Sequence, residues 1–140
     1  VGVSGGSSDD GLAVETTMEV QFRLPPDRSA DGVAETVEGL LEDGVLEWKE
    51  PIEPVMASPR NAVARALRKG IRSQDGEPTH LRKTGTSDMN LFAGAWDVPM
   101  ATYGPGDSAL DHTPDEHLAL DEFDRAIEVL TTAATTLQDA

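Results

Sequence analysis

Several residue types are absent or scarce in this chain. It has no cysteine, which excludes a disulfide framework and a metal site built on thiolates. Aromatic residues make up 4% of the sequence, and only three of the 11 basic residues are lysines. No apolar run approaches the ~18 residues of a membrane span, and no signal peptide is recognisable, so we expect a cytoplasmic protein without a membrane partner. Because the sequence starts at Val1 rather than at methionine, we also expect a longer parent protein.

Acidic residues far outnumber basic residues in this sequence. The chain has 26 acidic residues against 11 basic ones, and its formal net charge is -15. A carboxylate-rich, lysine-poor surface stays hydrated in strong salt, so we expect a halophilic cell, with an acidic protein from an ordinary cell as the alternative. Nucleic acid is not expected as a partner, because phosphate binding needs clustered cations. The one basic cluster is predicted to be a solvated helix face: Arg60, Arg65, Arg68, Lys69 and Arg72.

The first part of the chain carries the signals of a small sheet covered on one side. Residues 5–11 are rich in Gly, Ser and Asp and predict a turn or mobile loop. Residues 14–24 alternate apolar and polar side chains, which predicts a strand with one buried face. Ser29 or Asp31 can cap the helix that follows. Residues 45–56 predict an edge strand, because two prolines interrupt it.

Helices and short strands alternate in the second part. The Ser58-Pro59 pair predicts a helix start, with the serine as N-cap. Short strands are predicted at residues 79–83 and 98–103, and a helix at 89–96 between them. A last helix is predicted from about residue 120 to 137, with one apolar face: Leu120, Phe123, Ile127, Leu130, Ala134 and Leu137. This alternation is typical of a parallel α/β layer.

His112 is the best candidate for a metal ligand. It follows a Gly-Pro-Gly turn after an apolar segment and stands beside Asp111, close to Glu116. Imidazole is the commonest protein ligand for zinc, but a zinc site needs about three or four protein ligands. The alternative is a loop histidine that is hydrogen-bonded to one of these carboxylates. Asp111 is not expected to face the same way as His112 in an extended segment. The other histidines are expected to be surface or capping residues: His80 and His117.

A second candidate is the loop Thr84–Asp88, which lies between a predicted strand and a predicted helix. Backbone N–H groups and hydroxyls at a helix start can bind an anion such as a substrate carboxylate. The simpler alternative is an N-cap made by Thr86 or Ser87. Arg23 could clamp a carboxylate, or be an ordinary surface cation. Glu116 could orient His112, or be a carboxylate favoured by a helix N-terminus.

Three segments carry a family resemblance: Lys83–Asn90, Tyr103–Ser108 and Asp111–Leu118. Together they resemble the zinc amidohydrolases that include acetylornithine deacetylase, succinyl-diaminopimelate desuccinylase and aminoacylase. Within this family they are most similar to hydrolases that release lysine or ornithine from an amino-group carrier protein. The strand end Phe22–Pro26 also fits, and the resemblance covers essentially the whole chain.

The resemblance implies an α/β fold with a lid. Residues 1–57 would be the later part of a lid and dimerisation domain of α+β type. Residues 58–140 would be the C-terminal segment of an α/β zinc-peptidase-like catalytic domain. Similar enzymes are homodimers that bind two zinc ions per active site, with cobalt as a possible replacement.

The same resemblance assigns site residues. His112 matches a zinc ligand, with Glu116 supporting it. Gly85, Thr86 and the adjacent Ser87 match a substrate-contacting loop. Arg23 matches a lid arginine that grips the substrate carboxylate. The general base and the other zinc ligands have no counterpart here, so no catalytic residue is expected in this chain, and the chain alone is expected to be inactive and to bind zinc poorly.

Three functions follow as hypotheses. The first is part of a zinc hydrolase that releases lysine, or ornithine, from an amino-group carrier protein in lysine or arginine biosynthesis. The second is a deacetylase of a free N-acetyl amino acid. Its substrate is free, whereas the substrate of the first is bound to a carrier protein. The third is a non-catalytic dimerisation or ligand-binding module.

Overall fold

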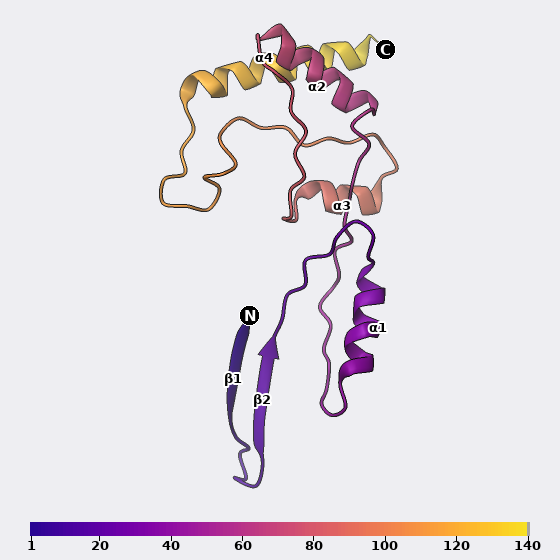
Figure 1. Cartoon of the computed structure of the whole chain (residues 1–140), viewed down its shortest axis with the longest axis vertical. Coiled ribbons are helices and arrows are strands. Elements are labelled where there is room, and N and C mark those ends of the chain that lie inside the picture. The colour runs from indigo at the N-terminus through magenta and orange to yellow at the C-terminus, as the bar shows by residue number, and fades with distance from the viewer. Residues whose placement is uncertain (140) are drawn as a thin grey trace.

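The computed structural model describes residues 1–139, so the end of the predicted second domain, at 140, lies outside it. A two-stranded sheet and four helices follow one another along the described residues (Figure 1). Their bounds are β1 Gly2–Ser7, β2 Val14–Glu19, α1 Ala30–Leu40, α2 Ala62–Ser73, α3 Asp88–Ala95 and α4 Leu120–Gln138. The hairpin and α1 lie at one end of the molecule, and α2 crosses α4 at the other. The mixed α/β character is confirmed, whereas the domain boundary at residues 57 and 58 stays a prediction.

The N-terminal hairpin pairs β1 and β2 in antiparallel register, with Gly2 opposite Glu19 and Ser7 opposite Val14. The prediction of a loop over residues 5–11 is therefore wrong for its first three residues, which form part of β1. Glycine suits Gly5, because a β-carbon there would lie 3.0 Å from the Thr16 hydroxyl and from a backbone oxygen. β2 is shorter than the predicted strand of residues 14–24 and ends at Glu19.

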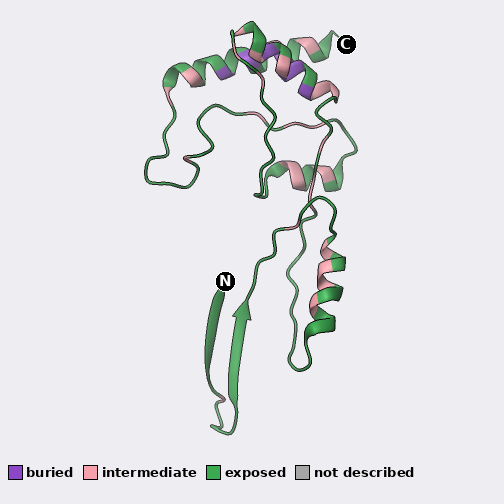
Figure 2. Ribbon diagram, in the orientation of Figure 1, coloured by how far each residue is buried: buried purple, intermediate pink, exposed green. Residues whose placement is uncertain are grey.

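The hairpin turn is held by Asp10. Its Oδ1 accepts a hydrogen bond from the Ser8 hydroxyl at 2.5 Å and another from the Leu12 N–H at 3.0 Å. Both hydrogen bonds stabilise the ionised carboxylate and so lower the pKa of Asp10 from its ordinary value, and the bond from Ser8 has the larger effect. Both strands of the hairpin are nevertheless coloured as exposed in Figure 2. Val14 is 82% exposed, so the predicted burial is wrong. The alternation reports an apolar face, but no other helix or strand of residues 1–139 covers it.

Helix α1 begins where predicted. Ser29 is its N-cap, and its hydroxyl accepts a hydrogen bond from the Gly32 N–H at 3.1 Å. Residues 45–56 do not form the predicted edge strand. Side chains of this segment contact β2 and α1. Lys49 Nζ lies 2.5 Å from Glu19 Oε1 on β2, and Trp48 Nε1 donates to Glu38 Oε1 on α1 at 3.1 Å.

The core lies where α2 packs against α4, and it is small. No polar or charged side chain is buried among the described residues, and the buried residues are Ala64, Ala66, Leu67, Gly70, Ala126, Val129 and Ala133. Small side chains let the helices approach closely, and a β-carbon on Gly70 would lie 2.4 Å from the Val129 carbonyl oxygen. The face of α4 predicted to be buried is instead turned away from α2, with Leu120 80% and Phe123 47% exposed. The larger apolar side chains of that face lie outside the core, which consists of Leu67 and Val129 packed with alanines of both helices.

Helix α2 begins three residues later than its predicted position. Ser58 and Pro59 form a turn, and Asn61 is the N-cap, with its Oδ1 accepting from the Ala64 N–H at 2.8 Å. Asn61 Nδ2 also donates to the Met100 carbonyl oxygen at 2.7 Å, which attaches a distant segment to the helix start. At the other end Asp75 has φ 55°, and the Gly76 N–H bonds back to the Ile71 carbonyl oxygen, as in a Schellman motif.

The predicted strands at residues 79–83 and 98–103 are not formed. Strands need a partner for their backbone N–H and C=O groups, and the described residues offer these segments none. The parallel layer predicted from the helix–strand alternation is therefore wrong as a description of this chain. α3, by contrast, spans almost the predicted 89–96 helix.

Much of the chain is open to solvent. Its accessible surface is 11502 Å², whereas a compact monomer of 14.9 kDa exposes about 7,000 Å². Large apolar side chains on the hairpin, α3 and α4 are exposed. None of the helices among the described residues has the length and apolar character needed to cross a membrane.

Candidate functional site

A hydrogen bond brings together two of the predicted substrate-binding segments. Arg23 follows β2, and its Nη1 donates to the backbone carbonyl of Thr84 at 3.3 Å, across 61 positions of sequence. The guanidinium therefore lies beside the loop that contains Gly85, Thr86 and Ser87. Its remaining N–H groups are available for an anion, since the described residues offer Arg23 no carboxylate partner within an ion-pair distance.

The loop over residues 84–88 leads into the first turn of α3. Ser87 is the N-cap residue, as the simpler of the two sequence interpretations predicted. Its N–H donates to Asn90 Oδ1 at 3.0 Å, which is the reverse half of a capping box. Asn90 Nδ2 in turn donates to the Glu53 carbonyl at 3.0 Å and fixes the helix start against the preceding segment. Gly85 has no atom within 4 Å of where a β-carbon would lie, so a ligand can approach its backbone closely.

His112 lies on a loop that is braced by short-range hydrogen bonds. Its backbone has φ 64°, in the left-handed region, so the segment is not extended as the sequence interpretation assumed. Its N–H donates to Glu116 Oε2 at 2.9 Å, and the neighbouring Thr113 N–H donates to the Leu110 carbonyl at 3.0 Å. Glu116 therefore holds the backbone of His112 rather than its imidazole. Among the described residues the imidazole has no hydrogen-bond partner and is exposed.

An ion pair joins this loop to the substrate loop. Lys83 Nζ lies 2.5 Å from Asp111 Oδ2, next to His112. From the sequence, Asp111 was weighed as a metal ligand and as a hydrogen-bond partner of His112, and Lys83 was given no role. The available signal was a lysine next to the loop in a chain with three lysines, but nothing in the spacing shows which carboxylate it meets.

The described residues do not make a metal site by themselves. They contain no group of three or more His, Asp or Glu side chains placed to hold a metal ion. The other histidines are engaged elsewhere: His80 Nε2 contacts Arg68 Nη1 at 3.1 Å, and His117 Nδ1 contacts the Asp115 carbonyl at 2.8 Å. A zinc ion needs about three or four protein ligands, so His112 can be at most one of a larger set.

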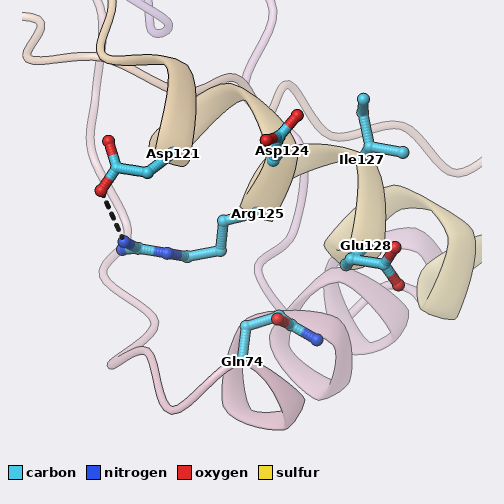
Figure 3. Close-up of a pocket in the computed structure, with 6 residues that line it drawn as sticks. All are labelled: Gln74, Asp121, Asp124, Arg125, Ile127 and Glu128. Carbon is cyan, nitrogen blue, oxygen red and sulfur yellow. Dashed lines mark ion pairs between the residues drawn. The ribbon is translucent and has the colours of Figure 1, made fainter.

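Two open pockets lie away from these residues. One, of about 410 Å³, is formed by Gln74 at the end of α2 and by α4, where Arg125 Nη2 lies 3.8 Å from Asp121 Oδ2 (Figure 3). Its other lining residues are Asp124, Ile127 and Glu128. The second, of about 610 Å³, is mostly apolar and lies beside α3, where Trp96 stacks on Phe92 with ring centroids 5.0 Å apart. Neither is lined by a predicted site residue.

The sequence pattern of peptidase family M20/M25/M40 matches residues 4–136, and the chain belongs to this family. It is 48% identical over 136 residues to the LysW-lysine hydrolase of Deinococcus radiodurans, an alignment covering 94% of this chain and 37% of the relative.

Two archaeal relatives are named LysW-lysine/LysW-ornithine hydrolase. The Sulfurisphaera tokodaii protein is 31% identical over 78% of this chain and 31% of its own length. The Saccharolobus islandicus protein is 29% identical over 86% of this chain and 35% of its own length. The chain thus spans about a third of the length of these relatives.

Proposed function

We propose that this chain is part of a metal-dependent hydrolase that releases lysine, or ornithine, from an amino-group carrier protein. The observation that carries the proposal is the 48% identity to a LysW-lysine hydrolase along 94% of the chain. It is supported by the contacts that join Arg23, the Thr84–Ser87 loop and the His112 loop, because these are the segments that carry the predicted site.

The proposed roles at the substrate end follow from charge and backbone geometry. Arg23, Gly85, Thr86 and Ser87 would bind the carboxylate of the amino acid that is released. A guanidinium and the free N–H groups at the start of α3 both favour an anion there. The hydrogen bond from Arg23 to Thr84 would hold the guanidinium in place before the substrate arrives.

His112 would be one ligand of the metal centre, with Glu116 holding its loop. We propose zinc as the metal, with two ions per active site and cobalt as a possible substitute. The described residues contain no group of three possible metal ligands, so further ligands and a general base are needed. In the proposal these come from the part of the longer relatives that this sequence does not cover, so the isolated chain would be inactive and would bind zinc poorly.

The domain roles are also proposals. Residues 1–57 would form part of a lid through which two copies dimerise, and residues 58–140 would belong to the catalytic domain. The exposed apolar face of the hairpin supports the first assignment, because a second copy would remove that face from water.

The test uses the protein from its complete reading frame, supplied with two substrates. One is lysine linked to the carrier protein, and the other is free N-acetyl-lysine. We expect lysine release from the carrier, with the free acyl amino acid a poor substrate. Faster hydrolysis of N-acetyl-lysine would favour a deacetylase, and no amide hydrolysis in the presence of zinc or cobalt would favour a non-catalytic module. Equilibrium sedimentation of the same protein tests the dimer.

A further inference from the structure

The ion pair between Lys83 and Asp111 crosses between two segments that lack regular secondary structure. Lys83 precedes the Thr84–Ser87 loop, and Asp111 precedes His112. Among the hydrogen bonds and ion pairs of the described residues, no other joins residues 79–88 to residues 104–119. The relative position of the two loops therefore depends on this contact more than on backbone pairing.

Each of the two loops is ordered within itself. The His112 loop is held by the Glu116 carboxylate and by the Asp107 carboxylate, whose Oδ1 accepts from the Ala109 N–H at 2.9 Å. The other loop is fixed by the Ser87–Asn90 bond and by Arg23. A single bridge between two internally braced loops can set their separation, because no other hydrogen bond or ion pair of the described residues joins them.

We propose that Lys83 is a positioning residue that, through Asp111, sets the distance between the His112 loop and the substrate loop. Lys83 contacts neither the substrate nor a reacting group in this account. The effect of Lys83 on the rate of hydrolysis rests on the proposed function. The distance between the two loops does not, since it can be measured without a substrate. The charged pair keeps 56% of the lysine side chain and 45% of the aspartate side chain exposed, so its role is geometric rather than a large contribution to stability.

The distance is tested with spin labels on introduced cysteines; this chain has no cysteine of its own, and any cysteine elsewhere in the longer protein is first replaced by serine. Cysteines introduced by Thr79→Cys and Ser108→Cys, both at exposed positions, carry the labels in the protein from the complete reading frame. We expect a narrow distance distribution with the native pair and with Lys83→Arg. Lys83→Met and Asp111→Asn should each broaden it, and the charge exchange Lys83→Asp with Asp111→Lys should narrow it again.

Lys49→Met is the matched control, because it removes the other lysine–carboxylate pair of the same 2.5 Å length and should leave the distribution unchanged. An unchanged distribution in both Lys83→Met and Asp111→Asn would overturn the proposal. So would a charge exchange that fails to restore the narrow distribution while circular dichroism shows native helix content.

Kinetics of the same variants separate positioning from substrate binding. Displacement of a site segment by about 1 Å can cost on the order of 10²-fold in rate, so Lys83→Met should lower kcat and leave KM nearly unchanged. Asp111→Asn should do the same, and the double variant should be no worse than either single one. A rise in KM for Lys83→Met alone would mean that Lys83 binds the substrate and would overturn the proposal. Absence of hydrolysis by the native protein would instead count against the proposed function, and the spin-label distances would still decide the role of Lys83.

Discussion

Single residues hold this chain together at points where regular secondary structure does not. Lys49 attaches the segment after α1 to β2, Asn61 attaches residue 100 to the start of α2, and Lys83 attaches one loop to another. All three contacts join residues at least 28 positions apart. The sequence shows the donors and acceptors but not their pairing, so none of these contacts was predicted.

The Glu19–Lys49 pair predicts a pH-dependent contact. The Lys49 hydrogen bond, and then its charge, lower the pKa of Glu19, and Glu19 likewise raises the pKa of Lys49. A lowered carboxyl pKa means that the contact is present above the ordinary value of 4.5 and is lost as pH falls through the lowered pKa. The contact is also lost when the pH rises through the raised pKa of Lys49, because the ammonium group then loses its charge.

The measurement is an NMR titration of the Glu19 side chain in the native chain and in Lys49→Met. We expect the substitution to return the pKa of Glu19 toward its ordinary value. Asp10 is the internal control, since its pKa is lowered mainly by Ser8 and should not respond to Lys49. An unchanged Glu19 titration in Lys49→Met would contradict the pairing.

At the scale of elements, the sequence predicts helices well and strands poorly. All four helices lie within a few residues of their predicted positions, because caps such as Ser29 and Ser87 and the apolar periodicity are local signals. Strands depend on partners, so residues 79–83 and 98–103 remain unpaired even though their composition is strand-like. The packing face of α4 was mispredicted for a related reason: periodicity shows two apolar stripes, and only the structure shows which one meets α2.

The crossing of α2 and α4 predicts the effect of a single methyl group. In Gly70→Ala the new β-carbon would lie 2.4 Å from a backbone oxygen of Val129, so the helices must separate. We expect the free energy of unfolding to fall by about 1–3 kcal/mol, as measured by thermal unfolding followed by circular dichroism. Gly39→Ala in α1 is the control, because nothing lies within 4 Å of the new β-carbon. The higher helix propensity of alanine should there raise the free energy of unfolding by up to about 1 kcal/mol. Equal effects of the two substitutions would contradict the close approach.

The start of α2 predicts that Asn61 has two separable roles. Asn61→Ala removes both the cap to Ala64 and the bond to Met100, and should cost about 1–2 kcal/mol in the free energy of unfolding. Asn61→Asp keeps the capping acceptor and loses the donor, so it should retain most of the helix stability. Hydrogen exchange at the Ala64 amide measures the cap directly. If both variants lose protection equally, the cap assignment is wrong.

At the scale of the whole molecule, far more large apolar side chains are exposed than are buried among the described residues. The exposed stripe of α4 includes Phe123, Ile127 and Leu130, while Val129 on the other side is 1% exposed. Exposed apolar patches of this extent mark surfaces that another part of a protein or a partner covers. The expectation of a salt-adapted cell rests on the same surface, through its charge of -15, and stays a prediction.

The two stripes of α4 predict different responses to substitution. Val129→Ala should lower the free energy of unfolding of the 140-residue chain by about 2 kcal/mol, through lost burial and a cavity. Ile127→Thr should change it by less than about 0.5 kcal/mol, because that side chain is 46% exposed. In the protein from the complete reading frame the Ile127→Thr cost should rise if another segment covers the stripe. The measurement is denaturant unfolding of both variants, made in the 140-residue chain and in the protein from the complete reading frame. A small effect of Ile127→Thr that is equal in the two proteins would show that the stripe stays exposed to solvent.

The most direct test of the account is the metal content of His112 variants of the protein from the complete reading frame. His112→Asn is the suitable substitution, since asparagine tolerates the φ of 64° at this position. His117→Asn is the matched control on the same segment. Metal per protomer is measured by plasma mass spectrometry after dialysis, together with hydrolysis of carrier-linked lysine. We expect His112→Asn to lose one metal ion and nearly all activity, and His117→Asn to keep its metal and its activity. Full metal content and activity in His112→Asn would show that His112 is not a ligand.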